Sequence, residues 1–277
     1  MKLSVIIVNH NACSLLKQAL ISLVNACKGI DYEILVVDNG SEDKSLEMLS
    51  MSFPEVIVIT NDNDNGIAKA GNQGIKLATG EYILMVNADI ISLKDSIEKM
   101  TAFMDGHLDA GGLSVRMLSP QGRFLPESVH GLTKMWTVFL KFIGFSKYLS
   151  KTRLYNRNGK DWVEEFQIAE VDILNGGCML LRRSVLNETG LFDERFYMFG
   201  HDIDLSYRIR MAGFKNYYFP KTYIINFETN RFAKFSWSYI KYYYGAMLIF
   251  ALKYLFKMPV IKVQGIPQLF PSNYEVK

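Results

Sequence analysis

A short apolar run followed by two polar residues constrains the fold of this chain more than any other feature. Residues 82–86 are Tyr-Ile-Leu-Met-Val, and Asn87 and Asp89 follow them closely. A strand that is apolar on both faces is typical of a parallel sheet covered by helices on both sides. The expected strand therefore ends in an amide and a carboxylate, at the sheet edge where open α/β folds bind ligands.

Strand and helix patterns alternate along the first part of the chain. The predicted strands are residues 3–8, 33–37, 56–59, 82–86 and 110–117. The predicted helices are residues 14–26, 68–78 and 94–104, with a further helix start at Ser41. Because the connections are short, this alternation predicts an α/β fold with a doubly wound, mostly parallel central sheet and helices on both faces.

Polar clusters also follow the first three predicted strands. They are residues 9–11, 38–41 and 61–66, which are rich in Asn, Asp and Gly. Each cluster alone is typical of a turn. Because the carboxyl ends of parallel strands meet at one edge, the set indicates a ligand site. Asp38 is the best candidate there to accept a hydrogen bond from a ribose or a base N–H.

Several function classes are disfavoured by what the sequence lacks. It has no Gly-x-Gly-x-x-Gly after the first strand and no Gly-x-x-x-x-Gly-Lys-Ser/Thr, which argues against a dinucleotide cofactor and a kinase-type phosphate loop. A net charge of +3 over 277 residues gives no reason to expect a nucleic-acid partner. The three cysteines are widely spaced and odd in number. We therefore expect neither disulfides nor a zinc site, and a reducing, cytoplasmic setting.

The second half has a weaker pattern with two landmarks. Residues 119–170 mix aromatic residues with lysines, which favours a surface subdomain over a mobile flap or a membrane-facing patch. Gly176 and Gly177 interrupt a predicted strand, which indicates a bulge or the close approach of another molecule. Asp202 falls at a predicted helix start, where it suits an N-cap, a general base, or both.

Four motifs give the chain its resemblance to a known family. They are residues 5–11 (Val-Ile-Ile-Val-Asn-His-Asn), 37–41 (Val-Asp-Asn-Gly-Ser), 87–89 (Asn-Ala-Asp), and 192–196 (Phe-Asp-Glu-Arg-Phe) with 201–205 (His-Asp-Ile-Asp-Leu). In this order they resemble the family-2 glycosyltransferases, which have the nucleotide-sugar-binding fold called GT-A. The resemblance covers about residues 3–228 and is greatest to bacterial rhamnosyltransferase-like enzymes of surface-polysaccharide assembly.

The resemblance implies an inverting transfer of one sugar from a nucleoside-diphosphate sugar to a hydroxyl of a saccharide or lipid-linked acceptor. It makes Asp202 the general base and Asp89 the ligand of Mg²⁺ or Mn²⁺ on the diphosphate. The residues expected at the acceptor are Gly176, Gly177 and His201. The residues expected at the nucleotide are Asn9, Asn11, Asp38, Asn39, Ser41, Asn65, Gly66, Asn72 and Asn87.

Two positions depart from the family pattern. His201 stands where the family usually has Glu, which affects acceptor choice more than activity. Asn226 stands where members often have a His near the diphosphate, so metal affinity is expected to be weaker unless Glu228 compensates. These departures leave an alternative hypothesis, in which the chain is a nucleotide-sugar-binding protein of the same fold that has lost turnover. A nucleotidyltransferase is a second alternative, although its Gly-rich loop is absent.

The C-terminal region forms a separate part of the predicted organisation. We expect a GT-A domain at residues 1–228. Its nucleotide-sugar half would cover about 1–118, and its acceptor half about 119–228. An aromatic, basic helical region and a tail are expected at 229–277. Its apolar run, 245–252, is shorter than the roughly 20 residues that span a bilayer. A helix there would pack on the sheet, form a homodimer interface, or lie at the inner membrane face beside a lipid-linked acceptor.

Overall fold

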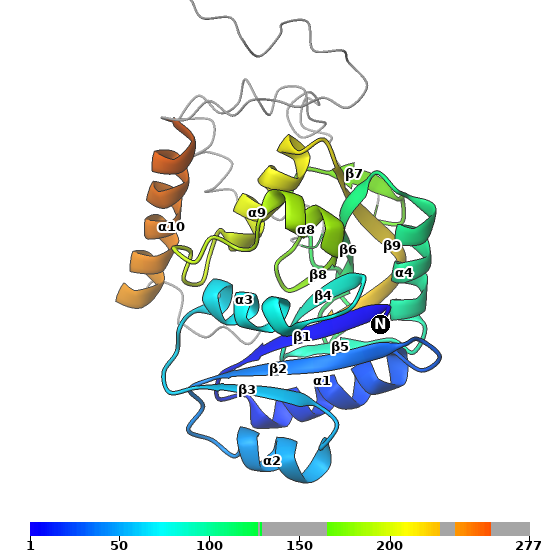
Figure 1. Ribbon diagram of the computed structural model, residues 1–277, viewed down its shortest axis with the longest axis vertical. Helices are drawn as coiled ribbons and strands as arrows, with labels where there is room; N and C mark the ends of the chain where they lie inside the picture. The colour runs from blue at the N-terminus through cyan, green and yellow to red at the C-terminus, as the bar shows by residue number, and fades with distance from the viewer. Residues whose placement is uncertain (127, 129–164, 228–235, 256–277) are drawn as a thin grey trace, which may run out of the picture.

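The computed structural model describes residues 1–126, 128, 165–227 and 236–255. Most of the expected surface subdomain at 119–170 lies outside these ranges, as do Glu228 and the C-terminal tail. Within them the chain forms a central sheet with helices on both faces (Figure 1).

The sheet begins with parallel strands and becomes mixed toward its other side. Its path is β3-β2-β1-β4-β8-β6-β9-β5, with β7 added beside β9. The strands are β1 (Leu3–Asn9), β2 (Tyr32–Asn39), β3 (Ile57–Asn61), β4 (Tyr82–Asn87), β5 (Ile90–Ser92), β6 (Ala110–Leu118), β7 (Ala169–Val171), β8 (Cys178–Arg182) and β9 (Lys215–Asn226). Neighbours among β3, β2, β1 and β4 are parallel, as predicted, whereas β8 runs antiparallel to β4.

The helices divide between the two faces of the sheet. They are α1 (Cys13–Ala26), α2 (Ser45–Ser52), α3 (Ile67–Leu77), α4 (Ser96–Gly106), α8 (Arg183–Thr189), α9 (His201–Met211) and α10 (Trp237–Leu255). Apolar residues of α1, α2 and α4 share one buried cluster, and those of α3, α8 and α9 share another. Strand β4 supplies Leu84 and Val86 to the first cluster and Ile83 and Met85 to the second, which explains its continuous apolar sequence.

Helix α10 packs on the domain through a third apolar cluster. Tyr243, Met247 and Phe250 of α10 pack there with Phe196 and Ile203, which lie before and within α9. The predicted C-terminal helix is therefore confirmed, and its apolar residues pack with α9, the loop before α9 and Ile173. No helix in the described ranges is long and apolar enough to cross a membrane.

Two helical glycines differ in the space around them. A Cβ added at Gly74 in α3 would lie 2.6 Å from Cγ2 of Ile6 and 3.3 Å from Cγ2 of Val37. Both side chains are buried and β-branched, so they yield little. A Cβ added at Gly245 in α10 would meet nothing within 4 Å. Gly74 is thus required for the close packing of α3 on the sheet, whereas Gly245 is not.

We predict opposite effects of alanine at these two positions. Gly74→Ala should lower the free energy of unfolding by about 1–3 kcal/mol through overpacking. Gly245→Ala should raise it by about 0.5–1 kcal/mol, because alanine is more favourable than glycine inside a helix when the added methyl group meets no neighbouring atom. Urea unfolding measures both changes, provided that the slope of the free energy of unfolding against urea concentration is the same in the variants and the wild type. Equal stabilisation by the two changes would contradict the packing described here.

Candidate active site

The loops after β1 and β2 are joined by the carboxylate of Asp38. Asn9 Nδ2 donates to its Oδ1 at 2.8 Å, and the Ser41 N–H donates to its Oδ2 at 3.0 Å. Ser41 Oγ in turn accepts from the Asn11 N–H at 2.9 Å and from Asn9 Nδ2 at 3.1 Å. Asp38 is 1% exposed. The structure therefore shows Asp38 holding the two loops together. Its contact with a nucleoside stays a prediction.

Asn39 makes the corresponding connection to the loop after β3. Its Oδ1 accepts from the Asn65 N–H and from Asn61 Nδ2, each at 3.1 Å. Its Nδ2 donates to Asp64, whose Oδ1 also accepts the Gly66 N–H at 2.9 Å. Gly66 has a φ of 79° at the start of α3, a conformation that glycine adopts easily. The strand ends are therefore cross-linked by side-chain amides and carboxylates.

Of the residues expected at the nucleotide, Asn72 lies apart from this network. It is buried within α3, where its Nδ2 donates to the Phe192 carbonyl at 2.9 Å and its Oδ1 accepts the Phe192 N–H at 3.0 Å. Nδ2 also reaches Glu194 Oε1 at 3.0 Å. Asn72 thus ties α3 to the segment before α9. Asn87 lies at the end of β4, paired in register with Val8 of β1.

Asp89 lies in the tight turn between β4 and β5. Its carbonyl accepts the Phe227 N–H at 3.0 Å, and the next residue, Ile90, pairs in register with Asn226. The backbones of residues 89 and 226 therefore lie close together, and the roles of Asp89 and Asn226 at a metal stay predictions. The side chain of Asp89 is largely buried.

These residues fit a divalent cation only together with a diphosphate. No group of three His, Cys, Asp or Glu side chains that could hold a metal occurs in the ranges given above. Mg²⁺ is often bound through one or two carboxylates plus substrate phosphates rather than by a complete protein cage. One carboxylate, Asp89, beside an amide, Asn226, is the donor set that such shared binding requires.

Gly176 and Gly177 form a turn before β8 and do not interrupt a strand, so that part of the sequence interpretation is wrong. The reason is Asn175, whose Oδ1 accepts the Gly177 N–H at 2.8 Å and closes the turn locally. The Gly177 carbonyl accepts the Asn87 N–H at 3.0 Å. The turn therefore lies at the carboxyl end of β4, two residues from Asp89.

Asp202 contacts the other side of this turn. Its Oδ2 accepts the Gly176 N–H at 3.2 Å, and a Cβ at Gly176 would lie only 3.0 Å from that oxygen. Its Oδ1 accepts the Ile203 N–H at 2.9 Å. Asp202 is not the N-cap of α9, because Gly200 occupies that position in a left-handed conformation with a φ of 87°. Asp202 instead lies in the first turn, where the helix dipole favours a carboxylate.

The nearby carboxylate of Asp204 has a different environment. It is fully buried and accepts from Arg208 Nε at 2.9 Å, Lys253 Nζ at 2.6 Å and Tyr254 OH at 2.6 Å. A carboxylate with these partners cannot meet an acceptor hydroxyl. Of the two acids in this turn, Asp202 is the one that remains partly exposed.

His201 packs inside the protein next to Asp202. It is 7% exposed, and its ring lies 5.3 Å from the Phe192 ring in an edge-to-face arrangement. Burial lowers the pKa of His201, so its ring is neutral at pH 7. The structure shows His201 in packing, and its contact with an acceptor stays a prediction.

The thiol nearest the site is not suited to nucleophilic catalysis. Cys178 directly follows the Gly176–Gly177 turn, and burial raises its pKa to about 12. Only a thiolate is a competent nucleophile. A covalent mechanism through this residue is therefore disfavoured, in agreement with the sequence interpretation.

Sequence reasoning missed several residues that build the site. Asn175 carries a local signal, since Asn before Gly-Gly is typical of a side-chain-closed turn. Arg208 follows Asp204 by four residues, the spacing of a helical ion pair. Lys253 and Tyr254 carry no such signal, because they reach Asp204 from 49 and 50 residues away in the chain.

Comparison with known proteins gives the following matches. The family model described as glycosyl transferase family 2 matches residues 4–190. N-acetylglucosaminyl-diphospho-decaprenol L-rhamnosyltransferase of Mycobacterium tuberculosis is 24% identical over 234 residues, which cover 78% of this chain and 73% of that protein. Poly(ribitol-phosphate) beta-glucosyltransferase of Bacillus spizizenii is 40% identical over 94 residues, which cover 32% of this chain and 15% of that protein.

Two solved structures have similar folds. TarS 1–349 of S. aureus in complex with UDP-GlcNAc matches with a TM-score of 0.56 and 18% identity, over 84% of this chain and 60% of that one. Mannosyltransferase PcManGT from Pyrobaculum calidifontis in complex with GDP-Man and Mn²⁺ matches with a TM-score of 0.57 and 17% identity, over 83% and 58%. The chain spans less than two thirds of either structure, and at this identity the likeness shows the fold alone.

Proposed function

Because the chain belongs to glycosyl transferase family 2, we propose that it transfers one sugar, with inversion, from a nucleoside-diphosphate sugar to a hydroxyl of a saccharide or lipid-linked acceptor. The observation that carries this proposal is the turn of Gly176 and Gly177. One of its residues hydrogen-bonds the Asp202 carboxylate, and the other hydrogen-bonds Asn87, two residues before Asp89. A candidate base and a candidate diphosphate site thus lie on opposite sides of one short turn.

In the proposed reaction Asp202 accepts a proton, and the diphosphate leaves from the opposite face of the anomeric carbon. As the acceptor oxygen bonds to the anomeric carbon, the bond from that carbon to the diphosphate oxygen breaks. Asp202 takes the hydroxyl proton during this step. A single displacement inverts the anomeric centre and needs no covalent intermediate. Holding acceptor and donor in line supplies much of the remaining acceleration.

The donor is proposed to lie along the edge formed by β1, β2, β3 and β4. The cross-linked loops that contain Asp38 and Asn39 would hold the nucleoside, and Asp89 with Asn226 would hold Mg²⁺ or Mn²⁺. When bound, such an ion stabilises the negative charge of the departing diphosphate. The acceptor is proposed to lie beside the Gly176–Gly177 turn, next to Asp202.

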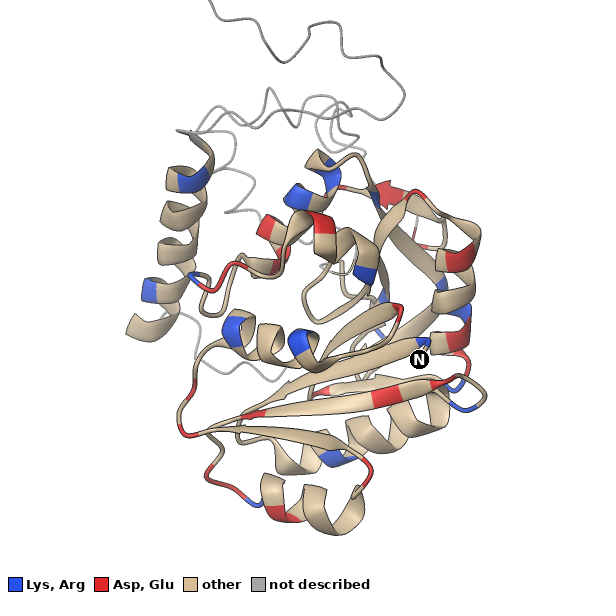
Figure 2. Cartoon of the chain, in the orientation of Figure 1, with Lys and Arg blue, Asp and Glu red and all other residues tan. Residues whose placement is uncertain are grey.

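The acceptor is proposed to be a sugar on a polyprenyl diphosphate. The name of the M. tuberculosis relative describes rhamnosyl transfer to such a lipid-linked sugar. In this chain, α10 offers a surface that suits a lipid acceptor. Its residues Trp237, Tyr244, Leu248 and Leu252 are exposed and recur at helical spacing. Helix α10 has basic but no acidic residues (Figure 2), and its exposed Lys241 favours peripheral contact with anionic lipid at the inner face of the membrane.

The first prediction tests the base. Asp202→Asn keeps an oxygen for the Ile203 N–H, so the free energy of unfolding should fall by no more than about 1 kcal/mol. Sugar transfer should fall by about 10²–10⁴, because an amide cannot take the proton. Release of nucleoside diphosphate is followed with UDP-GlcNAc, GDP-mannose and dTDP-L-rhamnose as donors and an N-acetylglucosaminyl-diphospho-polyprenol as acceptor.

The matched control for this variant is Asp95→Asn, which changes an exposed carboxylate at the start of α4. It should leave transfer unchanged. Near wild-type transfer by Asp202→Asn would refute the assignment of the base. Donor binding by the wild-type protein with no turnover of any donor would favour the alternative of a binding protein that has lost its activity.

The second prediction tests the metal site. Asp89→Ala should abolish the part of nucleoside-diphosphate affinity that depends on Mn²⁺, while affinity for the bare nucleoside persists. Asn226→His should increase the Mn²⁺-dependent part, because it restores the residue that the family often has near the diphosphate. Calorimetry with UDP, GDP and dTDP, with and without Mn²⁺, measures both variants. Unchanged Mn²⁺-dependent affinity in Asp89→Ala would exclude Asp89 as the ligand.

The third prediction tests the exposed face of α10. Leu248→Glu should reduce co-sedimentation with phosphatidylglycerol vesicles at low salt, and Met51→Glu, an exposed apolar residue of α2, should not. Equal vesicle binding by Leu248→Glu and the wild type would rule out this surface. If light scattering instead finds a dimer that Leu248→Glu dissociates, the same face is a homodimer interface.

A further inference from the structure

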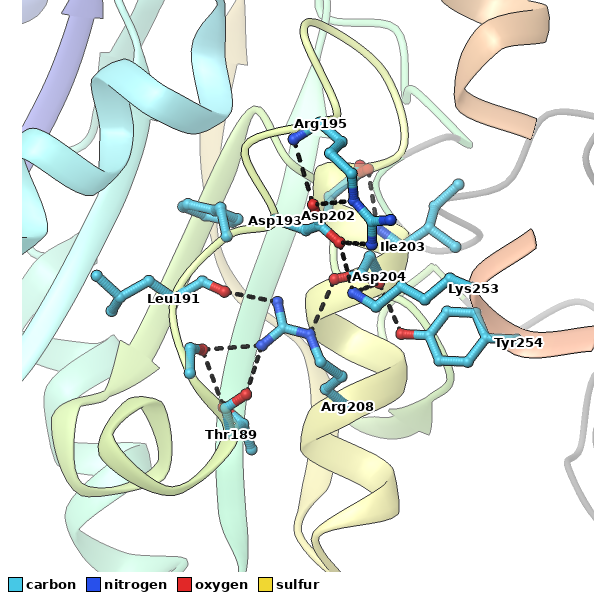
Figure 3. A network of polar contacts seen from close by, with 12 residues as sticks. Thr189, Leu191, Asp193, Arg195, Asp202, Ile203, Asp204, Arg208, Lys253 and Tyr254 are labelled. Carbon is cyan, nitrogen blue, oxygen red and sulfur yellow. Dashed lines mark hydrogen bonds and ion pairs between the residues drawn. The ribbon is translucent and has the colours of Figure 1, made fainter. Parts of the chain in front are cut away.

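Helix α10 reaches the two acidic segments that flank the candidate base. Lys253 Nζ donates to Asp193 Oδ2 at 2.8 Å and to Asp204 Oδ1 at 2.6 Å, as Figure 3 shows. Asp193 lies in the segment before α9, and Asp204 lies in the first turn of α9, two residues after Asp202. One ammonium group from the C-terminal helix therefore joins the loop before α9 to the first turn of α9, which contains Asp202.

Asp204 extends this connection to a third segment. Its Oδ2 accepts from Arg208 Nε at 2.9 Å. The remaining nitrogens of Arg208 donate to the carbonyls of Thr189 at 2.6 Å, Gly190 at 2.9 Å and Leu191 at 2.7 Å. The chain that leaves α8 is thereby fixed against α9. Loss of the charge on Lys253 would leave Asp204 with Arg208 as its one ion-pair partner among the described residues, whereas Asp193 would keep Arg195.

The protonation states in this network are consistent with its geometry. Hydrogen bonds from Arg195 and then Lys253 hold the pKa of Asp193 well below its usual range, so the group is ionised. Burial, and then the neighbouring Asp204 carboxylate, raise the pKa of Tyr254, so its hydroxyl stays a donor. A buried carboxylate depends on all of its donors, because an unpaired charge away from water is strongly disfavoured.

A second contact connects α10 to the loop before α3, which lies on the side proposed to bind the donor. The rings of Tyr242 in α10 and Tyr197 stack with centroids 4.3 Å apart. The Tyr197 carbonyl accepts the Ile67 N–H at 2.7 Å, at the start of α3, and its hydroxyl donates to the Asp64 carbonyl at 3.2 Å. Helix α10 therefore contacts the loop next to Gly66 through Tyr197 and the base-bearing turn through Lys253.

We propose that Lys253 is a positioning residue for sugar transfer: by joining Asp193 to Asp204 it fixes the first turn of α9 and the direction of the Asp202 carboxylate. The inference rests on the proposed function, since it acts through Asp202 as the base. Docking of α10 does not itself depend on Lys253, because Tyr243, Met247 and Phe250 bury their side chains in the apolar cluster with Phe196. The charge is therefore needed for orientation more than for folding.

The test is Lys253→Met in the full chain. The variant should keep its nucleoside-diphosphate affinity in Mn²⁺, while kcat for transfer falls by about 10- to 100-fold, the range expected when a reacting group is misplaced by about 1 Å. The assay uses the donor of the panel above that the wild type turns over fastest. Lys253→Arg keeps the charge and should restore much of kcat. Lys17→Met, which removes an exposed lysine of α1, is the control and should have no effect.

Two further measurements separate positioning from general destabilisation. Hydrogen exchange should be faster in Lys253→Met at the Asp204 amide, which bonds to the Gly200 carbonyl at 2.9 Å, while exchange in β1 is unchanged. In the Asp202→Asn background, Lys253→Met should cause no further loss of kcat, because residues that act through one group are not additive. An equal, additive loss in both backgrounds, or wild-type kcat in Lys253→Met, would overturn the proposal.

Tyr254→Phe keeps the inference testable if Lys253→Met does not fold. It removes one hydrogen bond to Asp204 and retains the ring in the apolar cluster, so kcat should fall by a smaller factor with little change in melting temperature. Wild-type kcat and exchange in Tyr254→Phe would then overturn the proposal. If Asp202→Asn retains transfer, the proposed base is wrong, and this outcome is distinct from any result obtained with Lys253.

Discussion

The carboxylate of Asp204 has no exposed surface, and the surrounding structure is arranged to balance its charge. A buried ion that lost its partners would cost several kcal/mol, so Arg208, Lys253 and Tyr254 must all reach it. Arg208 comes from the same helix, and the other two come from the C-terminal helix. Two of its three partners thus come from α10, whose apolar residues already pack against α9, and Lys253 is also shared with Asp193 in the segment before α9.

A second set of polar contacts organises the opposite side of the site without a buried ion pair. Asp38 and Asn39 end β2, and their side chains accept hydrogen bonds from the neighbouring loops. These contacts hold three strand-end loops in one arrangement before any ligand is present. Such preorganisation reduces the entropy lost on binding. The strand-end loops are thus fixed by local amide contacts, and the first turn of α9 is fixed by contacts between distant segments.

The sequence predicted the first half of the fold well because its signals are local. Apolar runs such as residues 82–86 gave the parallel strands, and the motifs gave the family and the GT-A fold, which the comparisons confirm. The sequence interpretation failed at Gly176–Gly177, where a hydrogen bond from Asn175 makes a turn rather than a bulge. It also missed the contacts of Lys253 with Asp193 and Asp204. The contact of Lys253 with Asp204 depends on how two helices pack, and no spacing rule encodes that.

The two acids of the α9 first turn illustrate why motif and structure are both needed. In the sequence, Asp202 and Asp204 are equivalent carboxylates two residues apart. In the structure, Asp204 faces Arg208 and Lys253 and is saturated, whereas Asp202 faces the Gly176–Gly177 turn through a single N–H. A helical repeat of 3.6 residues turns two such positions about 200° apart, so one must point inward when the other points to the strand ends. The buried acid therefore anchors the helix that carries the proposed base, and neither carboxylate has the surroundings that the other's role needs.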